Sequence, residues 1–171
     1  EAVVENDDVP IPDRLFELHM EIEAQYSAHV ASLNNTTVVY KVMGSASILP
    51  KYFKDTGDPR FVAQVTIGHN RYSTNTLSNF PRVQPFSLLG HNGEINTIKK
   101  LRYEADMIGV PLVEGGSDSQ DVNRTIETLI HRFGFTLFEA MELIFPPIHN
   151  EMKSFRPELQ DLYVYYRQIW G

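Results

Sequence analysis

The chain has 171 residues, enough for one domain around one buried core, and its formal net charge is −7. Lys and Arg form no dense stretch, which argues against a nucleic-acid-binding face, and no apolar run approaches the roughly 18 residues of a membrane span. We therefore expect a cytoplasmic protein that binds neither nucleic acid nor a membrane. The sequence has no cysteine, which excludes disulfides, cysteine-ligated metals and a cysteine nucleophile within these residues.

The first half of the chain combines one long helical pattern with several strand-like runs. Apolar side chains at Leu15, Leu18 and Ile22 predict an amphipathic helix over residues 11–30, with Asp13 as its cap. A short helix is expected within residues 46–53. Three apolar or β-branched runs predict strands, and the second is apolar enough for the centre of a sheet: "TTVVYKV" (36–42), "RFVAQVTIGHN" (60–70) and "PFSLLGHN" (85–92).

The second half of the chain predicts helices, and capping residues indicate where they begin and end. Glycines favour helix C-termini, and a Thr followed three residues later by Glu forms a capping box at a helix N-terminus. The predicted helices cover residues 94–109 up to Gly109, 118–134 up to Gly134, 136–147 with Thr136 and Glu139 as capping box, and 156–170 with Pro157 in the first turn.

Two charged residues have the chemistry to bind a free amino acid. Arg71 follows the second predicted strand, and a guanidinium fork is well suited to an α-carboxylate. Asp118 stands where a helix is expected to begin, after the glycines of "EGGSDS", and its carboxylate would complement an α-ammonium. Taken separately, each has a more ordinary interpretation: a surface ion pair for Arg71 and a helix cap for Asp118.

The stretch "HNG" (91–93) follows the third predicted strand. The side-chain N–H of Asn92 and the backbone N–H of Gly93 can point at one oxygen and form an oxyanion hole, although Asn-Gly is also a favoured tight turn. Thr74 is one of several hydroxyl residues near Arg71 that could line a polar pocket. His69 and His91 occupy matching places in "GHNRYSTNT" and "GHNGEINT", but no metal-ligand spacing surrounds them, and we expect no metal site.

In this order, "HNRYSTNT" (69–76), "VQPF" (83–86), "HNGEINT" (91–97) and "SDS" (117–119) resemble one family. They are similar to the glutaminase domain of glutamate synthases, within the class II glutamine amidotransferases, which are N-terminal-nucleophile hydrolases. The similarity is strongest over residues 30–145. The "HNGEINT" string is specific to the glutamate synthase branch, whereas the Arg and Asp positions are shared across the class.

The resemblance implies a role for each candidate residue in one glutamine pocket. Arg71, helped by Thr74, would hold the α-carboxylate, and Asp118 would hold the α-ammonium. Asn92 and Gly93 would form the oxyanion hole for the γ-amide carbonyl. The reaction implied is acyl transfer from glutamine to a thiolate, followed by hydrolysis to glutamate.

The family's nucleophile is an N-terminal cysteine, which this sequence lacks. We expect that the cysteine lies in a leading segment absent from this sequence; a homologue that naturally lacks it is the alternative. In either case this chain alone is predicted not to hydrolyse glutamine.

The resemblance also implies a fold and a set of partners. The fold expected is α/β (α+β), part of a four-layer αββα sandwich with antiparallel sheets, with residues 1–171 as one partial amidotransferase domain. The partners implied are glutamine and the synthase domains or subunits that accept its ammonia, with 2-oxoglutarate as acceptor in glutamate synthase. FMN and an iron–sulfur cluster would belong to domains absent from this chain, which itself is expected to bind no cofactor.

Two other interpretations stay open. A non-catalytic amino-acid-binding module would need Arg71 and Asp118 but not the oxyanion hole, so an Asn92→Ala change would leave its affinity nearly unchanged. A structural subunit would use the aromatic stretch "LYVYYRQIW" (162–170) to bind a partner. Tyr163, Tyr166 and Trp170 recur at helical spacing, however, which favours a buried helix face.

Overall fold

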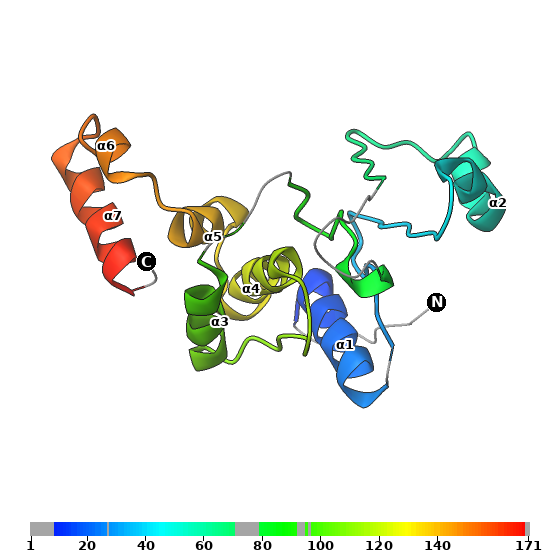
Figure 1. Cartoon of the computed structure of the whole chain (residues 1–171), viewed down its shortest axis with the longest axis horizontal. Helices are drawn as coiled ribbons and strands as arrows, with labels where there is room; N and C mark the ends of the chain where they lie inside the picture. Colours follow the sequence, from blue (N-terminus) through cyan, green and yellow to red (C-terminus); the bar gives the residue numbers. More distant parts are fainter. Residues whose placement is uncertain (1–8, 27, 71–78, 92–94, 96, 170–171) are drawn as a thin grey trace. The chain divides into compact units, whose positions relative to one another are not determined.

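Figure 1 shows the computed structural model of the chain, which describes residues 9–26, 28–70, 79–91, 95 and 97–169. All the regular structure in these residues is helical. The α-helices are α1 (Ile11–Gln25), α2 (Leu49–Tyr52), α3 (Ile98–Met107), α4 (Asp118–Phe133), α5 (Leu137–Ile144), α6 (His149–Met152) and α7 (Pro157–Ile169). Short 3₁₀ turns form η1 (Ala46–Ile48), η2 (Lys54–Gly57) and η3 (Phe80–Arg82).

The chain divides into two compact units. Unit 1 comprises Glu1–Ile95 and Val113–Asn123, and unit 2 comprises Asn96–Leu112 and Arg124–Gly171. The first turns of α4 therefore belong to unit 1 and the rest of that helix to unit 2. The expectation of a single domain over residues 1–171 stays a prediction.

The predicted sheets are wrong for the described part of the chain. Residues 36–42, 60–70 and 85–91 adopt neither helix nor strand, and no strand occurs elsewhere in the described residues. A strand needs a neighbour to complete its ladder of hydrogen bonds, and these runs have none there. Val62, expected in the centre of a sheet, is 85% exposed. The structure thus contradicts a four-layer sandwich of antiparallel sheets.

The helix predictions are confirmed, with changes at some ends. α1 begins at Ile11 after an N-cap at Pro10, so Asp13 lies inside the first turn and does not cap the helix. Pro12 lies in the first turn, where its missing N–H has no intrahelical partner, and the helix dipole favours the carboxylate of Asp13 in the same turn. Gly109 and Gly134 follow α3 and α4 with φ of +72°, the left-handed conformation that ends helices.

Helix α4 contains the most deeply buried residues of the structure. Val122, Ile126 and Leu129 are at most 3% exposed and recur at the spacing of one helix face. The polar residues between them are buried as well, and Thr128 satisfies its hydroxyl by donating to the carbonyl of Arg124 at 2.8 Å. Every residue from 119 to 129 is buried, which holds the polar side chains of this part of the helix in fixed positions.

Local contacts account for the helices at the end of unit 2. Thr136 and Glu139 form the predicted capping box at the start of α5, which confirms that prediction. Tyr163 of α7 is buried. Its ring lies tilted against that of Phe155, with ring centroids 5.8 Å apart, and its hydroxyl donates to Glu142 at 3.1 Å. Its ring also meets Tyr166 edge-on at 6.2 Å. Tyr163 is therefore part of a helix packing face.

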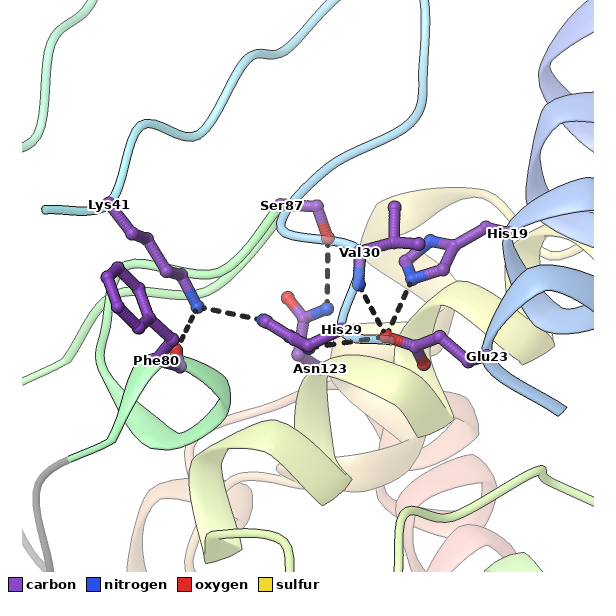
Figure 2. Close-up of polar contacts among 8 residues, drawn as sticks. All are labelled: His19, Glu23, His29, Val30, Lys41, Phe80, Ser87 and Asn123. Carbon is purple, nitrogen blue, oxygen red and sulfur yellow. Dashed lines mark hydrogen bonds and ion pairs between the residues drawn. The ribbon is translucent and has the colours of Figure 1, made fainter. Parts of the chain in front are cut away.

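A chain of polar contacts fastens residues 29–41 to α1 in unit 1 (Figure 2). Oε1 of Glu23 lies 3.2 Å from Nδ1 of His29 and accepts the backbone N–H of Val30 at 3.0 Å. Nε2 of His29 lies 3.3 Å from the ammonium of Lys41, which also donates to the carbonyl of Phe80 at 3.0 Å.

None of the helices in the described residues has the length and hydrophobicity of a membrane span.

Candidate functional site

The segment of residues 82–91 is attached to the start of α4 within unit 1. Its first anchor is Arg82, whose guanidinium donates from Nε to the carbonyl of Gly115 at 2.8 Å and also from Nη2 to the same oxygen. This contact joins η3 to the glycine turn that precedes α4. Gly115 has a φ of +70°, a conformation that glycine adopts without strain.

Asn123 forms the second anchor. Its side-chain Oδ1 accepts the backbone N–H groups of Leu88 and Leu89 at 3.0 and 3.1 Å. Its Nδ2 donates to the hydroxyl of Ser87 at 2.9 Å, as Figure 2 shows. One buried amide thus satisfies three groups of a segment with no regular secondary structure, which fixes its course along α4.

The third anchor brings His91 to the first turn of α4. Nε2 of His91 lies 2.6 Å from the hydroxyl oxygen of Ser119, and the backbone N–H of His91 donates to Oε1 of Gln84 at 2.7 Å. Nε2 of Gln84 in turn donates to the same Ser119 hydroxyl at 3.4 Å. His91 opens the "HNG" motif and Ser119 closes the "SDS" motif, so the two motifs meet at this point.

The first turn of α4 has a defined polar arrangement. The hydroxyl of Ser117 accepts the backbone N–H of Gln120 at 3.1 Å, so Ser117 is the helix cap. Asp118 follows it, and its Oδ1 accepts both the backbone N–H of Ser119 at 2.7 Å and the Ser119 hydroxyl at 3.1 Å. The carboxylate lies in the first helical turn, where the helix dipole favours negative charge.

Gln120 is a buried polar side chain with spare hydrogen-bonding capacity. It is 4% exposed, and neither Oε1 nor Nε2 has a hydrogen-bond partner in the described part of the chain. A Cβ added at Gly116 would lie only 3.1 Å from this Oε1 and 3.0 Å from the carbonyl of Val113, so a side chain at Gly116 would require these neighbours to shift. A buried amide without partners costs free energy unless a water or ligand supplies them.

Of the predicted site residues, only Asp118 lies in the described residues. It stands at the start of α4, as the sequence predicts. Arg71, Thr74, Asn92 and Gly93 lie outside the described residues, and their roles stay predictions. Among the described side chains, no group of three or more His, Asp or Glu is arranged to hold a metal ion.

Sequence reasoning missed the residues that attach the segment of residues 82–91 to the start of α4. These are Gln84, Ser119 and Asn123. A signal for two of them was present: Ser119 and Asn123 are spaced i, i+4 and so share one face of a helix. Polar residues one turn apart beside the apolar Val122 and Ile126 indicate a helix face that receives a polar segment.

Comparison with known proteins gives consistent results. The family model described as glutamine amidotransferases class-II matches residues 13–170. The chain is 34% identical over 158 residues to the chloroplastic ferredoxin-dependent glutamate synthase of Spinacia oleracea, covering 81% of this chain and 10% of that protein. It is 32% identical over 155 residues to the NADH glutamate synthase of Saccharomyces cerevisiae, covering 81% and 7%. No solved structure matches the chain.

A third relative, ferredoxin-dependent glutamate synthase 2 of Synechocystis, is 31% identical over 157 residues, covering 81% of this chain and 10% of that protein. The chain therefore spans about a tenth or less of the length of these relatives. The motifs that meet at α4 lie inside the matched region. The chain belongs to the class II glutamine amidotransferases, and its relatives in that family are glutamate synthases.

Proposed function

We propose that this chain is the glutamine-binding part of a glutamate synthase-like amidotransferase. The parent protein would hydrolyse glutamine to glutamate and ammonia and pass the ammonia to an acceptor, for which the resemblance to glutamate synthases implies 2-oxoglutarate. The observation that carries the proposal is the 2.6 Å contact between His91 and Ser119, because it brings the neighbours of Asn92 and Asp118 together.

Each residue of the proposed pocket recognises one part of glutamine. Asp118 binds the α-ammonium, and Arg71 with Thr74 binds the α-carboxylate. Asn92 and Gly93 donate to the oxygen of the γ-amide, where negative charge develops as a nucleophile attacks. The amide of Gln120, in the first turn of α4, is buried without a partner in the described residues, and an ordered water or a ligand group could supply one.

The chemical step needs parts that this sequence does not contain. With no cysteine in the 171 residues, the attacking thiolate must come from elsewhere in the parent protein. Iron–sulfur clusters are held mainly by cysteine thiolates, so a cluster would also be bound elsewhere, as would FMN. The ammonia acceptor would bind to other domains or subunits.

A cytoplasmic location for this protein stays a prediction, since the spinach relative is named as chloroplastic.

Calorimetric titration of the chain with glutamine tests the proposal. Replacing Asp118 by Asn should weaken binding about tenfold or more, because a charge-assisted hydrogen bond is lost. The exposed Asp161 on α7 provides the matched control, and Asp161→Asn should bind glutamine normally. Equal affinity of Asp118→Asn and the unchanged chain would contradict the proposed pocket, and steady glutamate release by the chain alone would contradict its lack of a nucleophile.

A second candidate is a glutamine-binding module without catalysis, with which the absence of cysteine from the sequence is equally consistent. Intact mass and N-terminal sequencing of the full-length natural protein separate the two. A processed cysteine at the head of that protein supports the enzyme. A protein with no N-terminal cysteine supports the binding module, and the Asn92→Ala variant should then keep nearly full affinity.

A further inference from the structure

A short relay of hydrogen bonds connects His91 to the carboxylate of Asp118. Nε2 of His91 lies 2.6 Å from the hydroxyl oxygen of Ser119, and that oxygen lies 3.1 Å from Oδ1 of Asp118. Ser119 is 4% exposed, so water has little access to the middle of the relay. Both groups are thereby coupled through one buried hydroxyl.

Counting donors and acceptors shows which group donates the proton in each hydrogen bond of the relay. A hydroxyl has one proton to donate and two lone pairs, and a carboxylate only accepts. If Ser119 donates to Asp118, its lone pairs accept from Nε2–H of His91 and from Nε2 of Gln84 at 3.4 Å, and every close contact is a hydrogen bond. If Ser119 donated to His91 instead, a lone pair of its oxygen would face Oδ1 of Asp118 at 3.1 Å, which is unfavourable.

We propose that His91 and Ser119 are positioning residues that orient the Asp118 carboxylate for the α-ammonium of an amino-acid ligand. The inference rests on the proposed function, since it concerns the same carboxylate. Oδ1 of Asp118 accepts the backbone N–H and the hydroxyl of Ser119, while Oδ2 accepts no hydrogen bond from the described residues. The relay therefore fixes one carboxylate oxygen and leaves the other to the ligand.

Gln84 completes the arrangement by fixing His91 itself. Its Oε1 accepts the backbone N–H of His91 at 2.7 Å, and its Nε2 reaches the Ser119 hydroxyl. A single side chain therefore sets both the backbone and the partner of the histidine. Gln84 thereby holds the histidine that acts on Asp118 through Ser119.

Two ligands distinguish positioning of Asp118 from general support of the fold. Glutamine carries the α-ammonium, and glutaramate is the same molecule without it. In the 171-residue chain, Ser119→Ala and His91→Leu should weaken glutamine binding about three- to tenfold, the effect of one hydrogen bond, and leave glutaramate binding unchanged. His91→Gln, which restores a side-chain N–H donor, should recover part of the loss, and His149→Leu on α6 is the exposed control.

Nitrogen NMR of the His91 ring tests the relay without any ligand. The proposal expects the proton on Nε2, and Asp118→Asn should shift the Nε2 resonance while leaving that of His149 in place. A proton on Nδ1 alone would overturn the relay, as would equal losses for glutamine and glutaramate or no loss for either. Should the unchanged chain fail to bind glutamine, the proposed function fails, and the ring tautomer still decides whether the relay exists.

Discussion

At the scale of single residues, Lys41 shows how burial changes a charge. Its ammonium donates to the carbonyl of Phe80, contacts His29 and lies 5.0 Å from the centre of the Phe86 ring. Burial disfavours the charged form and lowers the pKa of Lys41 from 10.5 to about 8, and the nearby charge of Glu23 offsets only part of this. The folded chain therefore holds this proton less tightly than the unfolded chain does.

The lowered pKa of Lys41 predicts how the free energy of unfolding depends on pH. Between about pH 8 and 10.5 the unfolded chain keeps the Lys41 proton that the folded chain has lost, so the free energy of unfolding should rise with pH in this window. In Lys41→Met this contribution to the rise should disappear, whereas Lys51→Met, at an exposed position of α2, should keep it. Urea unfolding at several pH values measures the difference. Identical pH slopes for Lys41→Met and the unchanged chain would contradict the prediction.

The residues of the candidate site were predictable only in part. Asp118 follows "EGG" and opens a helical pattern, and both signals are local in sequence. The partnership of His91 with Ser119 joins residues 28 apart, and no local pattern reports such a distance. The spacing of Ser119 and Asn123 indicates a polar helix face but not its partners, since the three bonds of Asn123 all go to residues at least 34 positions away.

At the scale of elements, helices were predictable and strands were not. A helix satisfies its hydrogen bonds within itself, so capping residues and apolar spacing determine it locally, as in α4 and α5. A strand depends on a partner elsewhere in the chain. Residues 36–42 and 61–67 have the composition of strands, yet no partner pairs with them in the described residues.

The capping box of α5 gives a prediction at this scale. Glu139 accepts the backbone N–H of Thr136 at 2.8 Å, and the hydroxyl of Thr136 accepts the backbone N–H of Glu139 at 3.3 Å. Thr136→Ala should lower the free energy of unfolding by about 1 kcal/mol, the usual effect of losing an N-cap. Chemical denaturation at pH 7 measures this loss.

Low pH should reduce the loss of stability that Thr136→Ala causes. The hydrogen bonds from Thr136 lower the pKa of Glu139, so their contribution is present above its usual pKa of 4.5 and is lost as the carboxylate becomes protonated below it. The stability gap between Thr136→Ala and the unchanged chain should therefore narrow as the pH falls below about 4.5. The control is Thr56→Ala, whose hydroxyl donates only to the carbonyl of Phe53 and has no carboxylate partner. A gap that stays constant down to pH 3 would show that Glu139 takes no part in the cap.

At the scale of the whole molecule, a strand-like run lies exposed. The run "FVAQVTI" (61–67) has no charge, no proline and no glycine, and it is rich in residues that favour β-structure. Val62 and Val65 are 85% and 78% exposed. Segments of this composition pair with copies of themselves when their backbone is accessible.

The isolated chain should therefore self-associate through this run. Replacing both Val62 and Val65 by Lys should raise the concentration at which association begins, because a charge at an exposed strand-like position opposes pairing between copies. Replacing the exposed polar residues Thr37 and Ser47 by Lys changes the net charge equally and removes no apolar surface. Sedimentation velocity over a concentration series compares the two variants. If both resist association alike, net charge governs solubility; if only the valine variant does, the exposed run is the surface on which copies meet.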